Sequence, residues 1–400
     1  MKNVYIVSAR RTPIGSFLGS LKNVSAPKLG ESVVRAILEE TEIETIKINE
    51  LVFGHVLPAG QGQGVGRQIS LNSGIDITVP AYTLNMVCGS GMKSVINGYT
   101  SILAGLHDVV IAGGVENMSQ APHLLTGMRE GKKMGSSTIE DHMLKDALID
   151  AFKGIHMGVT AENIADKYNI TREDQDAFAL ESQKRAIKAV DDGVFKDEIV
   201  PITTTVRHKE VVIDKDEYPN RSTNIEKLSH LRTVFKHEGS VTAGNASGLN
   251  DGASAIMLVS ENALKKYRLK PLVKIIAVGQ GGVDPDLMGL GPTVAIKKAL
   301  EYANISIEDI GVIELNEAFS AQSLGVIHEI IEQLGANKEK LMKITNVHGG
   351  AIALGHPLGA SGNRIIVTLV HEMLRQGVRY GLASLCIGGG MGTAVILEKV

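Results

Sequence analysis

The chain has only two cysteines and no tryptophan among its 400 residues, and aromatic residues make up only 4% of it. Two cysteines cannot form the disulfide framework that holds small secreted proteins together, so each needs an explanation of its own. Lys and Arg total 41 against 44 for Asp and Glu, which leaves a formal net charge of −3. This balance provides no global field for binding nucleic acid or an anionic membrane, and we expect neither partner.

Long apolar runs are also missing from the sequence. The first run, Val4 to Val7, has the length of a strand and is too short for the core of a signal peptide. No run approaches the roughly 20 residues that cross a bilayer, and the last residues, ILEKV, match no peroxisomal or prenylation signal. We therefore expect a cytoplasmic protein.

Short strand-like runs alternate with helix-length segments through much of the chain, as in VYIVSA, ELVFGHV and DVVIAGG, with a helix expected from about Lys93 to Leu106. This alternation favours an α/β fold with helices on the faces of a sheet. Between Ser119 and about Gly239 the chain is more charged and locally helical, which indicates an inserted subdomain. Segments that begin with CGSGMKSV and GASGNRII share one order of helix, strand and glycine cluster, which indicates two duplicated halves.

One cysteine, Cys88, lies in the stretch NMVCGSGMKSV, between a strand-like run and a helix. The amides and the dipole at a helix N-terminus favour a thiolate there, and the glycines that follow could leave room for a substrate. The alternative is a small buried hydrophobic residue at a turn, which is the commoner situation for an isolated cysteine.

Three other motifs add polar groups to glycine-rich or strand-end positions. His356 lies in GHPLGASG, where an imidazole could act as a base, although a lone histidine is usually structural. Asn316 and Glu317 follow the apolar run GVIEL, where Asn316 could face a site or cap a helix. Cys386 begins CIGGGMG, whose free amides could form an oxyanion hole or simply a flexible hairpin turn.

Taken together, these motifs closely resemble the thiolase family over nearly the whole chain, from VYIVSARRTPIGSF to CIGGGMG, with HMGVTAEN and AGNASGLNDGA between them. The resemblance implies two duplicated βαβ-type halves in a five-layered αβαβα sandwich with an inserted loop domain. Residues 1–118 plus 250–272 would form the first half, 119–249 the loop domain that binds coenzyme A, and 273–400 the second half. It also implies a homotetramer.

The chain looks most like the short-chain biosynthetic branch of this family, whose members are acyltransferases. The resemblance implies a reversible Claisen condensation of two acetyl-CoA to acetoacetyl-CoA and CoA through an acetyl-cysteine, with no metal and no other cofactor. It makes Cys88 the nucleophile, His356 its activator and Cys386 the acid/base at the second substrate. Asn316 would hold a water that binds the enolate oxygen together with His356, and the amides of Cys88 and Gly388 would form the other oxyanion hole.

The same resemblance assigns further residues to the substrate. Those expected to contact coenzyme A or its acyl group are His156, Met157, Phe235, Ala246, Ser247, Met288 and Phe319. Met157, Met288 and Phe319 would keep the acyl pocket short. Two positions depart from the family pattern: Asn220 stands where an arginine usually stacks on adenine, with Arg221 one place later, and His348 replaces an asparagine near the site.

Several alternatives remain open at this stage. The first is a degradative 3-ketoacyl-CoA thiolase of broader chain length. A ketoacyl-ACP synthase shares the fold, but Cys386 argues against it; a non-catalytic lipid carrier would be expected to lose the cysteines; and a redox dithiol protein would need no acyl acceptor. Oxidation could also link Cys88 to Cys386 if their Cα atoms come within about 7 Å.

Overall fold

The computed structural model describes residues 3–206 and 209–400. The first part of the chain contains β1 (Val4–Arg11), β2 (Gly15–Ser16), α1 (Ala26–Thr41), β3 (Glu50–Gly54), α2 (Val65–Asn72), β4 (Ala81–Leu84), α3 (Ser90–Ala104) and β5 (Val109–Asn117). The middle part contains β6 (His123–Leu124), β7 (Glu140–Asp141), α4 (Met157–Tyr168), α5 (Arg172–Asp191), β8 (Ile202–Val206), β9 (Lys209–Ile213) and α6 (Ile225–Ser229). The last part contains β10 (Asn250–Ser260), α7 (Glu261–Lys266), β11 (Val273–Gly282), α8 (Gly291–Ala303), β12 (Ile310–Leu315), α9 (Ser320–Leu334), α10 (Lys338–Ile344), α11 (Ala351–Leu354), α12 (Leu358–Gln376), β13 (Tyr380–Ile387) and β14 (Met391–Lys399).

The strands repeat one pairing pattern twice. In the first half the order β1-β10-β5-β3 is antiparallel, antiparallel and then parallel, and β11-β14-β13-β12 in the second half follows the same scheme. The halves join where β1 pairs with β11 over three residue pairs, from Val4 with Ile275 to Ile6 with Val273. The duplication expected from the two glycine-rich segments is therefore confirmed, because α3 with β5 corresponds to α12 with β13.

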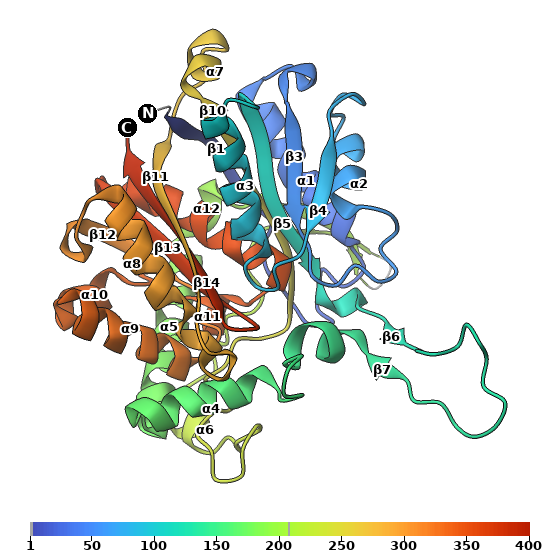
Figure 1. Ribbon diagram of the computed structural model, residues 1–400, viewed down its shortest axis with the longest axis vertical. Helices are drawn as coiled ribbons and strands as arrows, with labels where there is room; N and C mark the ends of the chain where they lie inside the picture. The colour runs from blue at the N-terminus through green and yellow to red at the C-terminus, as the bar shows by residue number, and fades with distance from the viewer. Residues whose placement is uncertain (1–2, 207–208) are drawn as a thin grey trace.

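The helices lie in three layers around the strands. α1 and α2 cover the outer face of the first half, α8 covers the outer face of the second, and α3 and α12 pack against each other between the two halves. Both central helices contact strands of both halves, and α12 occupies the middle of the molecule in Figure 1. The predicted five-layered sandwich is thus confirmed.

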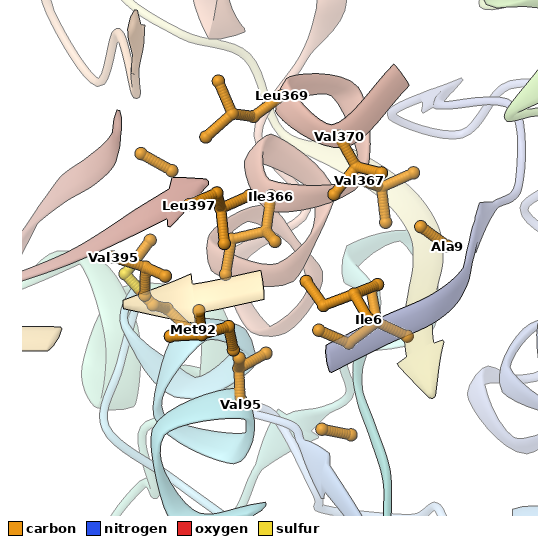
Figure 2. Close-up of a cluster of buried hydrophobic side chains, with 14 of the residues drawn as sticks. Ile6, Ala9, Met92, Val95, Ile366, Val367, Leu369, Val370, Val395 and Leu397 are labelled. Carbon is orange, nitrogen blue, oxygen red and sulfur yellow. The ribbon is translucent and has the colours of Figure 1, made fainter. Parts of the chain in front are cut away.

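The strands β5 and β10 are covered by helices on both of their faces. Every residue of both strands is buried, since α1 covers one face and the central helices cover the other. Figure 2 shows side chains of the two central helices meeting those of β1 and β14. Those labelled are Ile6, Ala9, Met92, Val95, Ile366, Val367, Leu369, Val370, Val395 and Leu397.

In the middle part of the chain, strands β6 and β7 form the base of an arm that leaves the body (Figure 1). The domain boundaries at residues 118, 249 and 272 stay a prediction. The charged stretch that forms α5 has one face buried against α9 and α11, although its sequence alone is most simply interpreted as a solvated helix. Among the described residues, no helix combines the length and the hydropathy needed to cross a membrane.

Candidate active site

Eleven of the twelve predicted site residues line one cavity of about 340 Å³ at the junction of the two halves and the middle part. They are Cys88, His156, Met157, Phe235, Ala246, Ser247, Met288, Phe319, His356, Cys386 and Gly388. Asn316 is the exception: it does not line the cavity, but Ala318 and Phe319, which follow it by two and three positions, do. The roles of these residues remain predictions, but the fold brings together segments that are up to about 300 residues apart in the chain.

Cys88 lies two residues before α3, which begins at Ser90 and not at Lys93. The preceding Val87 has a φ of 47°, a left-handed conformation that a β-branched residue rarely adopts. Asn85 Oδ1 accepts a hydrogen bond from the Val87 amide at 2.8 Å, and the Ser90 hydroxyl donates to the Val87 carbonyl at 2.7 Å. These contacts hold a strained turn that directs the cysteine toward the cavity.

The sequence suggested that the glycines around Cys88 leave room for a substrate. In the structure these glycines allow close packing instead. A Cβ at Gly89 would collide with Ile387, and one at Gly91 would lie 2.7 Å from the Asn363 amide on α12. These glycines therefore let the two central helices and the Cys386 loop approach the backbone of the Cys88 turn.

The expected thiolate is also corrected by the structure. Burial raises the pKa of Cys88 to about 11, and this effect outweighs the Gly388 amide, which donates toward the sulfur and favours the charged form. The free energy lost by taking a thiolate out of water is larger here than the stabilisation that the few nearby dipoles provide. Cys88 is therefore a neutral thiol at rest and needs a base to become a nucleophile.

His356, the predicted base, lines the same cavity as Cys88. Its backbone amide donates to Asn250 Oδ1 at 2.9 Å, and its Nδ1 lies 2.6 Å from the Ser361 hydroxyl. The Ser361 hydroxyl donates its single hydrogen to the Pro357 carbonyl at 2.9 Å, so its oxygen accepts a hydrogen bond from Nδ1–H of His356. Nε2 then carries the free lone pair, and it has no partner among residues 3–206 and 209–400.

The charge state of His356 agrees with this tautomer. Burial, followed by the nearby guanidinium of Arg364, lowers the pKa of His356 to about 3. The imidazole is therefore neutral across the physiological range, and its Nε2 can accept a proton from a thiol.

Cys386 lines the same cavity from the end of β13. It is buried, and burial together with the neighbouring Cys88 raises its pKa. Gly389 and Gly390, with φ of 86° and 83°, turn the chain into β14, so the motif does form a hairpin turn as well as presenting amides. Both cysteines are free thiols, and a link between them on oxidation stays a prediction.

Asn316 follows β12 directly and is completely buried. Its backbone amide donates to the Ser384 carbonyl at 3.0 Å. Neither polar atom of its side-chain amide has a partner within the described part of the chain. It does not cap α9, whose N-cap is Phe319, so the capping interpretation is wrong. An unpaired buried amide suits the predicted role of holding a water.

Residues that sequence reasoning missed fix the loop beside Asn316. The buried carboxylate of Glu317 accepts hydrogen bonds from the Ser182 hydroxyl at 2.6 Å and from Asn346 Nδ2 at 2.8 Å. Asn346 also bonds both the amide and the carbonyl of Leu315. We call Glu317, Ser182 and Asn346 the Glu317 clamp. No sequence pattern indicated this clamp, because its members lie on three separate elements.

Bulky side chains gather in one part of the cavity lining. Met157, Met288 and Phe319 are buried in one apolar cluster that includes Cys386. Phe235 meets Phe319 edge-on, with ring centroids 6.2 Å apart, and stacks on His156 at 4.5 Å. Burial lowers the pKa of His156. The backbone at Ala246 and Ser247 is tied to this part of the lining, since the Ser247 amide donates to the Ala318 carbonyl at 2.9 Å.

Both departures from the family pattern point away from the cavity. Arg221 forms two hydrogen bonds with Asp191, at 2.9 and 2.6 Å, and whether it replaces the usual contact with adenine stays open. His348, expected near the site, instead binds Glu372 Oε2 at 2.7 Å and lies edge-on to Phe195. It contacts α12 and is not among the residues that line the cavity.

Two family models match consecutive parts of this chain. The model described as "Thiolase, N-terminal domain" matches residues 4–262, and "Thiolase, C-terminal domain" matches residues 269–399. The chain is 49% identical to the acetyl-CoA acetyltransferases of Chromobacterium violaceum and Pseudomonas aeruginosa; each alignment covers at least 99% of both proteins. A probable acetyl-CoA acyltransferase of Staphylococcus aureus is 48% identical over the full length of both.

Solved structures show the same likeness. The acetyl-CoA acetyltransferase of Bacillus anthracis has a TM-score of 0.95 and 42% identity, with 100% of this chain and 99% of that chain covered. Human mitochondrial 3-ketoacyl-CoA thiolase also has a TM-score of 0.95, with 41% identity and the same coverage. The likeness therefore extends through every layer of the fold.

Proposed function

The chain belongs to the thiolase family, and from this premise we propose that it is an acetyl-CoA C-acetyltransferase that joins two acetyl-CoA reversibly into acetoacetyl-CoA and CoA. The observation that carries the proposal is the meeting of two thiols, Cys88 and Cys386, with the unpaired Nε2 of His356 at one cavity. The relatives named acetyl-CoA acetyltransferase support it. The reaction uses no cofactor beyond its CoA thioesters.

In the first half-reaction, Nε2 of His356 takes the proton of Cys88, and the sulfur attacks the acetyl carbonyl. The negative charge on the carbonyl oxygen is met by the amides of Cys88 and Gly388. The carbon–sulfur bond to CoA then breaks, and Cys386 gives its proton to the leaving thiolate. This leaves an acetyl group on Cys88, a protonated His356 and a Cys386 thiolate.

In the second half-reaction, the Cys386 thiolate removes an α-proton from another acetyl-CoA. The enolate oxygen is stabilised by the Nε2–H of His356 and by a water on Asn316. The α-carbon attacks the acetyl group on Cys88, the bond to sulfur breaks, and His356 returns its proton to Cys88. Cys386 keeps the α-proton, so every group regains its resting state.

A coupled assay tests this proposal most directly. Acetyl-CoA alone should yield acetoacetyl-CoA and CoA, and acetoacetyl-CoA with CoA should yield two acetyl-CoA. A protein that turns over neither substrate pair does not have the proposed activity. Light scattering would test the homotetramer that we propose with it, and cell fractionation its cytoplasmic location.

A second candidate is a 3-ketoacyl-CoA thiolase of broader chain length, favoured by the likeness to the human mitochondrial enzyme of that name. The bulky side chains of Met157, Met288 and Phe319 in the cavity lining support short acyl groups instead, because a filled pocket tolerates added methylenes poorly. Relative rates with long and short 3-ketoacyl-CoA substrates separate the two candidates.

A further inference from the structure

A single buried carboxylate contacts backbone amides from two separate loops near the cavity. Glu116 lies near the end of β5 and has no exposed surface. Its Oε2 accepts hydrogen bonds from the backbone amides of Val56 at 3.0 Å and Gly359 at 2.9 Å. Its Oε1 accepts one from the Leu57 amide at 3.1 Å and lies 3.1 Å from Nε2 of His55. Both oxygens are thus engaged, and Glu116 itself does not line the cavity.

The Gly359 amide joins Glu116 to the His356 loop. Gly359 lies in the first turn of α12, where backbone amides have no partner within the helix and a carboxylate is favourable. The helix begins directly after Pro357 and carries Ser361, whose hydroxyl lies 2.6 Å from Nδ1 of His356. A Cβ on Gly359 would lie 2.9 Å from Oε2 of Glu116, so a larger residue could not approach the carboxylate this closely. Glu116 therefore fixes the end of α12 that holds His356.

The Val56 amide joins the same carboxylate to the Cys88 turn. The Val56 carbonyl accepts a hydrogen bond from Nδ2 of Asn85 at 3.3 Å, and Oδ1 of Asn85 accepts one from the Val87 amide at 2.8 Å. Val87 is the residue in the left-handed conformation that directly precedes Cys88. A continuous series of hydrogen-bonded residues therefore leads from Glu116 through Val56 and Asn85 to the turn that carries the thiol.

The negative charge of Glu116 does not explain its place near the thiol. Burial raises the pKa of Cys88 to about 11, the Gly388 amide lowers it, and the carboxylate of Glu116 adds a smaller effect in the same direction as burial. A negative group here opposes the thiolate that the first half-reaction needs. What Glu116 can contribute to the reaction is therefore the geometry that its hydrogen bonds impose on the two loops.

We propose that Glu116 is a positioning residue that holds the Cys88 turn and the His356 loop in register, so that Nε2 of the imidazole can take the proton of the thiol. This inference rests on the proposed function, which it extends to a residue that touches neither substrate nor reacting atom. Asn85 takes part as the link between Val56 and the Cys88 turn.

The test follows alkylation of Cys88 by iodoacetamide at neutral pH in the full-length protein, with peptide mapping to separate Cys88 from Cys386. Glu116→Gln keeps the size of the side chain but replaces one acceptor oxygen with a donor. It should slow alkylation roughly 10- to 100-fold, because small misplacements of reacting groups have effects of this size. Glu116→Asp keeps the charge but shortens the side chain, and it should also be slow. If only the charge mattered, Glu116→Gln would react faster than the wild type and Glu116→Asp at the wild-type rate; either result overturns the proposal.

A double-mutant cycle with His356→Ala separates positioning from a general loosening of the fold. If Glu116 acts by aligning His356 with Cys88, Glu116→Gln should have almost no further effect on alkylation once the imidazole is gone. An equal loss in the wild-type and His356→Ala backgrounds would show that Glu116 only supports the fold, and the proposal would be wrong.

Glu372→Gln is the matched control. Glu372 is another buried carboxylate beside a histidine, with its Oε2 2.7 Å from Nε2 of His348, and it does not line the cavity. Its replacement should leave the alkylation rate close to that of the wild type. A loss as large as that of Glu116→Gln would mean that removal of any buried carboxylate slows the thiol, which contradicts a specific role for Glu116.

Asn85→Ala covers the case in which the Glu116 variants do not fold, because Asn85 is exposed. This variant should slow alkylation roughly 2- to 10-fold, which is the effect of one ordinary hydrogen bond, and again only while His356 is present. A wild-type rate for Asn85→Ala would remove the link to the Cys88 turn and with it the proposal. None of these measurements uses an acyl donor. Failure of acetyl-CoA to label Cys88 would count against the proposed function alone, so the two failures are distinguishable.

Discussion

The Ser361 hydroxyl lies 2.6 Å from Nδ1 of His356 and donates its only hydrogen to the Pro357 carbonyl. This arrangement makes Ser361 an acceptor for His356 and leaves Nε2 as the basic atom of the ring. A serine five residues after the histidine thereby determines which nitrogen faces the cavity.

Ser361→Ala should lower kcat roughly 10- to 100-fold, because a hydrogen bond to a group that becomes charged contributes about 1.5–3 kcal/mol. KM should change little, since Ser361 does not line the cavity. Steady-state kinetics measure both. Ser73→Ala is the matched control: Ser73 is also buried and donates to a helix carbonyl, but it lies on the remote α2 side. An equal loss of kcat in both variants would contradict the assigned role.

The two cysteines should divide the reaction between them. Cys88→Ala should form no acyl-enzyme, whereas Cys386→Ala should retain the acetyl group on Cys88 and fail to condense it. Intact-mass spectrometry after incubation with acetyl-CoA distinguishes these outcomes. Acetyl label on the Cys88→Ala protein would show that the nucleophile has been misassigned.

The bulky side chains in the cavity lining should limit acyl length. Adding methylenes to a filled pocket costs roughly 1–3 kcal/mol, so kcat/KM for thiolysis should be at least about tenfold higher for acetoacetyl-CoA than for 3-ketohexanoyl-CoA. Met288→Ala should narrow that ratio, while Met342→Ala, outside this cavity, should not. Equal rates with the two substrates in the wild type would favour the degradative thiolase instead.

The strained turn at Val87 should trade stability for activity. Val87→Gly should raise the free energy of unfolding by about 1 kcal/mol, because glycine adopts the left-handed conformation without strain. kcat should fall as the Cys88 turn loosens. Glu42→Gly provides the control, since Glu42 has a φ of 52° at the end of α1 and is remote from the cavity. Denaturant unfolding and kinetics on both variants test the idea, and a Val87→Gly enzyme with unchanged kcat would refute it.

The fold class and the candidate site residues could be predicted from the sequence, largely through the resemblance of its motifs to one family. Cys88, His356 and Cys386 lie in short glycine-rich motifs, and Asn316 directly follows an apolar strand-like run. Such motifs can be recognised locally, because turns need glycine, strand ends expose polar groups, and helix starts present free amides. The duplicated halves were readable for the same reason, since each repeats one local order of helix, strand and glycine cluster.

The charge states and the supporting contacts depend on the packing of the whole chain. Cys88 was expected to be a thiolate, but burial by segments from across the chain keeps it a thiol. His348 was expected near the site, and the structure shows that its partner is Glu372 on α12. Desolvation and side-chain partners are sums over neighbours that are distant in sequence, so no local motif contains them. For that reason the contacts of Ser361, Glu116 and the Glu317 clamp could be identified only from the structure, in which the central helices lie between the two halves.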